Sequence, residues 1–214
     1  MGRPARGSLA DPAGFWSPAS TKRILFRAPL LLAFAVCAED FAGKIAPLID
    51  PAKLATLGKR GANSRVQKCV YWLATAKAAG EKSDKVAGDA VASAGYTKEA
   101  AALTKAELLR NLDIAEKLGC LDADGLAKMR RGNAPTVRKG PYAGDIASVD
   151  HIIPRAVAPE LDNCIANLEL LPLKVNESKN DKIGARQIDL ARKLHSAGLL
   201  SAEGKQRIDS HPQR

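Results

Sequence analysis

The sequence predicts an α+β protein, in which a mostly helical N-terminal region is followed by a small element of two strands and a helix. Aromatic residues make up only 4 % of the 214 residues and apolar residues 46 %, so the core must consist mainly of Ala, Leu, Ile and Val. Alanine-rich segments favour helix over sheet. Runs rich in β-branched and apolar residues that end at a proline occur only late, at 146–154 and 167–172.

This pattern divides the chain into four parts. Residues 1–38 form a leader with a signal peptide, and 39–132 form the helical region. Residues 133–208 form a second domain that carries the strands, and we expect the tail, 209–214, to be disordered.

The leader has the order of a secretory signal. Lys22, Arg23 and Arg27 precede an apolar run at 28–36, and small residues follow that permit a cut before Glu39. The run is too short to cross a bilayer as a helix. We therefore expect a secreted or periplasmic protein with no membrane attachment once processed, translated from a start codon upstream of the true one. The alternative is a disordered leader followed by one buried helix.

Apolar residues recur at helical spacing from Asn63 onward. Val66, Cys69, Val70 and Leu73 lie at i, i+3, i+4 and i+7, which predicts a helix that begins at Asn63 or Ser64. Further helices are predicted at 85–94, after Thr97, and from Asp122 to Arg131. Thr104 and Glu107 have the spacing of a capping box, which indicates a helix start between them.

The four cysteines exclude one class of site. No two of them have C-x-x-C spacing, so the chain has no zinc knuckle. Removal of the signal would leave Cys69, Cys120 and Cys164, an odd number. Cys69 and Cys120 either pair in an oxidising compartment or are small buried hydrophobes.

The charge indicates a polyanionic partner. The formal net charge is +10, and nucleic acid is the commonest polyanion that a basic surface attracts. Basic residues without an intervening acid, among them Arg138 and Lys139, follow Gly125 as far as Gly144. This segment either grips a phosphate backbone or is a solvated linker.

The chemistry lies between Asp150 and Lys182. Asp150 and His151 are adjacent at the end of a predicted strand, so their side chains leave on opposite faces. Asn176 opens the long helix that we expect to follow the second strand and to end at Gly198, and it returns to the same point. The three segments form a compact strand-strand-helix clamp.

These residue types suit phosphodiester hydrolysis. The His151 imidazole can deprotonate a water molecule near neutral pH, and a divalent cation can stabilise the charge on phosphorus. The Asp150 carboxylate and the Asn176 amide are hard oxygen ligands, which suit Mg²⁺ or Mn²⁺. Asn167 lies where an amide could bridge the loop between the strands and hold the His151 backbone.

The motifs D-H-I-x-P, N-L-x-L-L-P and N-x-x-K-x-D-K, within Tyr142 to Arg186, resemble those of the HNH endonucleases, which have a ββα-metal fold. The resemblance implies that His151 is the general base and that Asn167 orders the loop. It implies that Asp150 and Asn176 are the metal ligands.

The resemblance also implies phosphate contacts from Lys179, Lys182 and Arg186. The chain lacks the cysteine knuckles of some relatives, and asparagine at the last ligand position disfavours tight Zn²⁺ or Ni²⁺ binding. We expect a metal-dependent endonuclease that cuts DNA with little sequence preference. The alternatives are an inert nucleic-acid-binding module and an exported toxin-type nuclease, and the sequence does not identify a protein partner.

Overall fold

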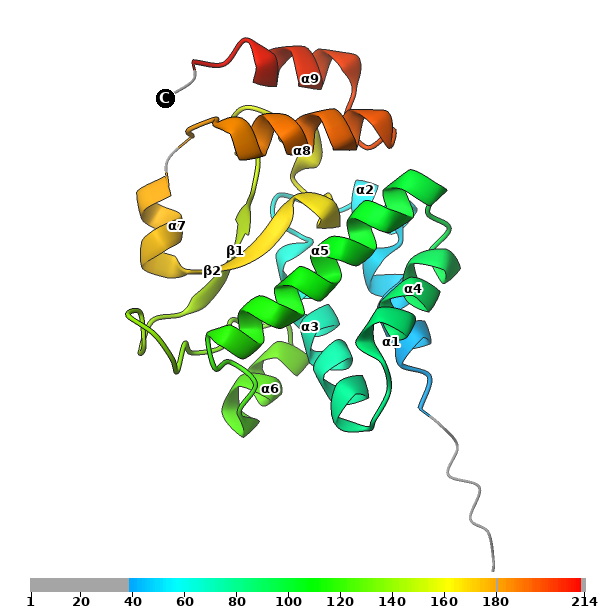
Figure 1. Ribbon diagram of the computed structural model, residues 1–214, viewed down its shortest axis with the longest axis vertical. Helices are drawn as coiled ribbons and strands as arrows, with labels where there is room; N and C mark the ends of the chain where they lie inside the picture. The colour runs from blue at the N-terminus through cyan, green and yellow to red at the C-terminus, as the bar shows by residue number, and fades with distance from the viewer. Residues whose placement is uncertain (1–38, 180, 213–214) are drawn as a thin grey trace, which may run out of the picture. The chain divides into compact units, whose positions relative to one another are not determined.

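Helices build most of the molecule, and the sheet among the described residues is a single antiparallel pair of strands. The structure is a computed structural model that describes residues 39–179 and 181–212. Mixed α and β structure that is mostly helical is as predicted. The helices that precede the strands are α1 (Phe41–Ile49), α2 (Pro51–Ala55), α3 (Asn63–Ala78), α4 (Ser83–Ser93), α5 (Lys98–Lys117) and α6 (Ala123–Arg130) (Figure 1).

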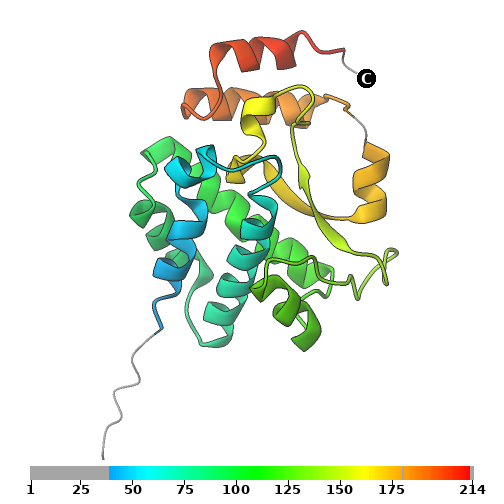
Figure 2. The ribbon, with the colours of Figure 1, turned by 180° about the vertical axis from the view of Figure 1, so that it is seen from behind.

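Two aspartates start the first helices. Asp40 Oδ1 accepts a hydrogen bond from the Gly43 backbone N–H at 2.7 Å, which caps α1. Asp50 Oδ1 accepts from the backbone N–H of Ala52 at 2.9 Å, and Pro51 occupies the first turn of α2, where its missing N–H costs nothing. These helices and α3 lie on the side that Figure 2 turns toward the viewer.

The helix α5 is continuous, so the capping box at Thr104 and Glu107 is wrong. Both residues are buried inside the helix and start none. The third polar residue of this face, Asn111, anchors the sheet. Its Nδ2 donates to the Leu168 carbonyl at 2.8 Å, and its Oδ1 accepts from the Leu170 N–H at 2.7 Å. Tertiary packing therefore overrides the local capping signal.

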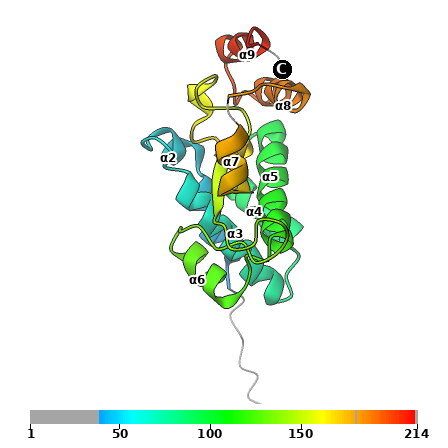
Figure 3. The ribbon, with the colours of Figure 1, turned by 90° about the vertical axis from the view of Figure 1, so that its left-hand side faces the viewer.

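The strands β1 (Ala147–His151) and β2 (Leu168–Pro172) pair with Asp150 opposite Glu169. Directly opposed residues share a face of the sheet. The face with Val149 belongs to the main core, where α3 packs against β1 and α5 against β2. The face with Asp150 turns toward α7 (Leu173–Lys179), which lies in front of the strands in Figure 3.

The helix after β2 is short, which corrects the prediction of one long helix opened by Asn176. Asn176 lies inside α7, and a separate helix, α8 (Ala185–Ser196), follows. Pro172 ends β2 just before α7, and Asp145 Oδ2 accepts from the Lys174 N–H at 3.0 Å and so caps the helix from outside. The helix therefore begins at Leu173, three residues before Asn176.

The last helix, α9 (Ala202–Asp209), begins at Ser201, whose hydroxyl accepts from the Gly204 N–H at 2.9 Å. It packs with α8 over a second apolar cluster that includes Ile153, Leu161 and Ile183. This cluster packs the loop between the strands against α8 and α9. The tail predicted from residue 209 is described as far as 212.

The proposed leader, 1–38, lies outside the described residues, and so does Cys37. From Glu39 on, the chain forms one compact unit. Among the described helices, none has the length and apolar character needed to span a membrane. Cys69, Cys120 and Cys164 are free thiols, and burial raises the pKa of Cys69 to about 12.

Candidate active site

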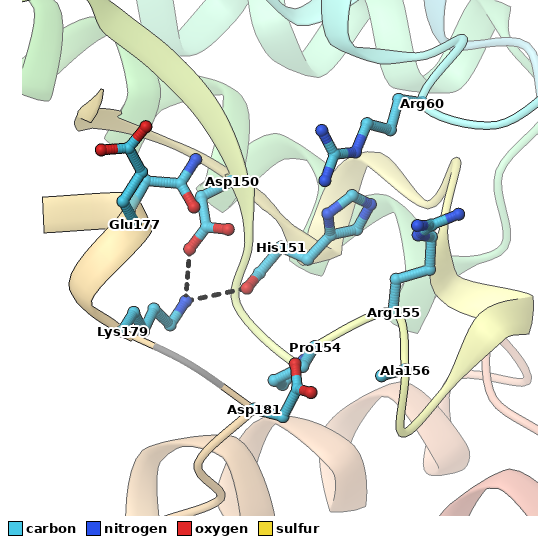
Figure 4. A pocket seen from close by; sticks show the side chains of 10 residues that line it. Arg60, Asp150, His151, Pro154, Arg155, Ala156, Glu177, Lys179 and Asp181 are labelled. Carbon is cyan, nitrogen blue, oxygen red and sulfur yellow. Dashed lines mark hydrogen bonds and ion pairs between the residues drawn. The ribbon is translucent and has the colours of Figure 1, made fainter. Parts of the chain in front are cut away.

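A polar hollow of about 220 Å³ lies where β1 ends. That volume holds a phosphate group with several water molecules, since one water in the liquid takes about 30 Å³. Figure 4 shows side chains entering it from three directions: the end of β1 and the loop behind it, α7, and the connection between α2 and α3. Its lining consists of Arg60, Asp150, His151, Pro154, Arg155, Ala156, Asn176, Glu177, Lys179 and Asp181.

The hollow collects both faces of the strand pair. His151 belongs to the face turned to the helical core and Asp150 to the face turned to α7. Both reach the hollow because they are the last two residues of β1. Asp150 and His151 therefore leave β1 on opposite faces, as predicted. Asn176 lines the same hollow from α7.

His151 is 7 % exposed and is held through one ring nitrogen. Its Nε2 lies 3.0 Å from both the backbone oxygen and Oδ1 of Asp162. A carbonyl oxygen and a carboxylate only accept hydrogen bonds, so Nε2 must carry the proton of the neutral ring. Nδ1, which has no partner among the described residues, is then the atom with a free lone pair.

Asn167 fixes the loop that follows His151. Its Oδ1 accepts from the backbone N–H of Ile153 at 2.8 Å, and its Nδ2 donates to the Ile153 carbonyl at 3.0 Å. The backbone of Asn167 itself accepts from the Ile152 N–H at 2.8 Å. Asn167 is fully buried, so these bonds define the loop path without water. The amide bridges the loop at Ile153 rather than at His151 itself.

Asp150 is engaged at one oxygen. Lys179 Nζ lies 2.7 Å from Asp150 Oδ2 and 2.8 Å from the backbone oxygen of His151, as the dashed lines in Figure 4 mark. The ammonium neutralises the half-buried carboxylate and sets its orientation. Asp150 Oδ1 has no partner within the described part of the chain.

Asn176 is engaged in the same manner. Its Nδ2 donates to Ser148 Oγ at 3.1 Å, which leaves Oδ1 without a protein partner among residues 39–179 and 181–212. The hollow thus offers one carboxylate oxygen and one amide oxygen whose companion atoms are already held. That donor set fits Mg²⁺, which binds through one or two protein oxygens and keeps several waters.

A site with more protein ligands is not built here. Within the described residues no group of three or more His, Cys, Asp or Glu side chains could enclose a metal ion. Two oxygens and open solvent are a poor site for zinc, which prefers three or four nitrogen or sulfur ligands.

No protein-family model, curated protein or solved structure matches this chain.

Glu169 lies opposite Asp150 in the strand pair and forms ion pairs with three basic side chains. It is 1 % exposed, and Arg186 approaches it with two nitrogens, at 2.9 and 2.6 Å. Arg110 Nη2 lies 2.8 Å from Glu169 and Lys179 Nζ lies 3.8 Å from it. The hydrogen bonds that Arg186 donates to Glu169 raise the pKa of Arg186. The guanidinium of Arg186 is thus committed to a buried carboxylate.

The other basic residues predicted to contact phosphate differ in whether an acidic side chain already pairs with them. Lys182 is exposed and has no ion-pair partner in the described part of the chain. Arg138 pairs with Asp122 at 2.9 Å and with Asp124 at 3.0 Å, so acids outside the basic segment neutralise it. Lys139 is exposed next to it and does not line the hollow.

Sequence reasoning missed three residues of the site. Asp162 is followed by Asn163, a pair of residues typical of loop turns, yet Asp162 holds His151. Glu169 stood out only as a charge inside an apolar strand, a signal that predicts a buried ion pair. Arg60 comes from a part of the chain about 90 residues earlier, and no local pattern marks it.

Proposed function

We propose that this protein is a metal-dependent endonuclease of the HNH type, with a ββα-metal site formed by β1, β2 and α7. One observation carries the proposal. An imidazole nitrogen, a carboxylate oxygen and an amide oxygen, each without a protein partner in the described residues, belong to side chains that line the same hollow. Their companion atoms are held by Asp162, Lys179 and Ser148.

His151 acts as the general base. Its Nδ1 takes a proton from a water molecule as the water oxygen bonds to phosphorus and the bond from phosphorus to the 3′-oxygen breaks. Asp162 keeps the ring in the tautomer that leaves Nδ1 free and stabilises the imidazolium that forms. Asn167 keeps the loop that carries Asp162 at the correct distance from β1.

Asp150 and Asn176 would hold the cation, and Mg²⁺ or Mn²⁺ suits their oxygens. A cation bound there would stabilise the negative charge that develops on the phosphate and on the leaving oxygen. Lys179 donates to Asp150 Oδ2, so Oδ1 is the carboxylate oxygen that would be available to a cation.

The substrate we propose is DNA, bound chiefly through its phosphates. The chain carries a net charge of +10, and its sequence has no recognisable reading helix or zinc finger beside the motif. Affinity of this kind falls steeply with salt and carries little sequence preference.

The test is a plasmid digest with the protein from Glu39 onward, with and without EDTA, across Mg²⁺, Mn²⁺, Zn²⁺ and Ca²⁺. We expect nicking with Mg²⁺ and Mn²⁺ that EDTA and the change His151→Ala both abolish. His211→Ala is the matched control, since His211 lies outside the hollow. A parent protein that binds DNA and never cuts it would identify an inert binding module instead.

Export is part of the same proposal and has its own test. Mass measurement of the protein produced in a secreting host should give a chain that begins at Glu39. A chain that retains the leader would contradict it.

A further inference from the structure

The connection between α2 and α3 brings Arg60 into the hollow. Arg60 has φ +57°, and it is the one described residue other than glycine with a positive φ. Its backbone N–H donates to Asp162 Oδ2 at 3.2 Å. The same carboxylate holds His151 through its other oxygen, so a single side chain positions both the base and the Arg60 backbone.

The next residue along, Asn163, fixes the rest of the connection. Its Oδ1 accepts from the Ala62 N–H at 3.0 Å, and its Nδ2 donates to the carbonyls of Leu57 and Gly58 at 3.3 and 3.2 Å. Residues 57–62 are therefore tied to the loop between the strands at both ends. Contacts to the loop that carries Asp162 and Asn163 therefore help to set the position of Arg60.

The fold gives no use for the Arg60 side chain. The guanidinium makes no hydrogen bond or ion pair with any described residue, and Figure 4 shows it extended toward the ring of His151. A glycine would take a positive φ without strain, whereas an arginine there is strained. An unpaired cation held in a strained conformation beside a base points to a ligand.

The ligand must be an anion that arrives next to His151. A guanidinium presents parallel N–H donors that match two oxygens of a phosphate group. On the α7 side of the hollow, Lys179 forms an ion pair with Asp150. Among the described residues that line the His151 side, Arg60 has no anionic partner, whereas Arg155 lies 4.0 Å from Asp162.

We propose that Arg60 binds the non-bridging oxygens of the phosphodiester that is cleaved, on the side opposite Asp150 and Asn176. This inference rests on the proposed nuclease function and extends it. The helical region then supplies part of the catalytic machinery, and the strand-strand-helix element is incomplete without it.

The test compares Arg60→Gln with Lys59→Gln. Lys59 is the adjacent exposed cation and does not line the hollow, so it controls for charge alone. Each variant is assayed on a supercoiled plasmid and on bis(p-nitrophenyl) phosphate, which has a single phosphodiester and no flanking phosphates. We expect Arg60→Gln to lower kcat/KM about 100-fold on both substrates, as loss of one donor to a developing charge does. Lys59→Gln should retain the parent value on the small substrate.

A third variant separates chemistry from folding. Arg60→Gly should keep or raise the Tm, because glycine removes the strain, while cleavage falls as in Arg60→Gln. A loss on plasmid alone would mean that Arg60 contacts only flanking phosphates, and it would overturn the inference. Equal activity of Arg60→Gln and the parent would overturn it too and leave the nuclease intact. A parent protein that hydrolyses neither substrate would instead defeat the proposed function.

Discussion

His151 Nε2 lies 3.0 Å from Asp162 Oδ1 and at the same distance from the Asp162 backbone oxygen. One residue therefore supplies both acceptors, and the second survives any change of its side chain. The carboxylate adds charge to an orientation that the backbone already sets.

Replacement of Asp162 tests that division. We expect Asp162→Asn to lower kcat about 10-fold, since it keeps an oxygen acceptor and loses the charge that stabilises the imidazolium. Asp162→Ala should lower kcat about 100-fold, in the range found for residues that orient a catalytic group. Single-turnover cleavage of plasmid gives both values. Full activity in Asp162→Ala would show that the backbone oxygen alone suffices.

Asn167→Ala should destabilise the fold. It leaves the Ile153 N–H and carbonyl buried without partners, and each such loss costs about 1–3 kcal/mol. The Tm should fall by roughly 5–15 °C for a chain of this size. The control is Lys182→Ala, an exposed position where the Tm should stay within about 2 °C. A Tm of Asn167→Ala equal to that of the parent would contradict the role of this amide.

Substitutions of Lys182 and Arg186 should have different effects on DNA binding and on stability. Lys182→Gln should reduce the slope of log K against log salt by about one and leave the stability unchanged, as an exposed phosphate contact does. Arg186→Gln should lower the stability by about 2 kcal/mol or more, because it leaves Glu169 buried with less compensation. Both are measured in the His151→Ala background by fluorescence anisotropy and by denaturant unfolding. Equal salt slopes for the two variants would place Arg186 on the phosphate after all.

Glu107 gives the protein a pH-dependent stability. Burial, reinforced by the nearby charge of Glu169, raises the pKa of Glu107 to about 7, from an ordinary 4.5. Between these values the folded chain retains a proton that the unfolded chain has lost, so the free energy of unfolding falls as pH rises from about 4.5 to 7. Glu107→Gln should remove this fall, so the variant gains stability over the parent at pH 8 and not at pH 4. Parallel curves for parent and variant would show that Glu107 titrates normally.

Local signals in the sequence predicted much of the fold. The apolar stripe at Val66 to Leu73 predicted α3, and Asp122 marked the start of α6. The same kind of signal was available at Asp40 and at Asp50-Pro51, where the caps of α1 and α2 lie. It failed at Thr104, because the core that buries this residue makes a longer helix more stable than the local cap.

The site residues likewise fall into those that local sequence signals predicted and those that depend on tertiary contacts. Asp150, His151 and Asn176 lie close in the sequence or in recognisable order, and they line one hollow. Asp162 and Arg60 could not be predicted, since their roles depend on contacts over long sequence separations, such as the 102 residues between these two. Such contacts arise from tertiary packing and leave no periodic pattern.

The most direct measurement of the central claim is a Mn²⁺ titration followed by the electron paramagnetic resonance of the free ion. The parent should bind one ion per chain, and Asp150→Ala and Asn176→Ala should each weaken that binding at least 10-fold. Glu177→Gln is the matched control, because its carboxylate lines the same hollow from α7 and is exposed. Unchanged binding in both ligand variants, or loss only in Glu177→Gln, would contradict the account.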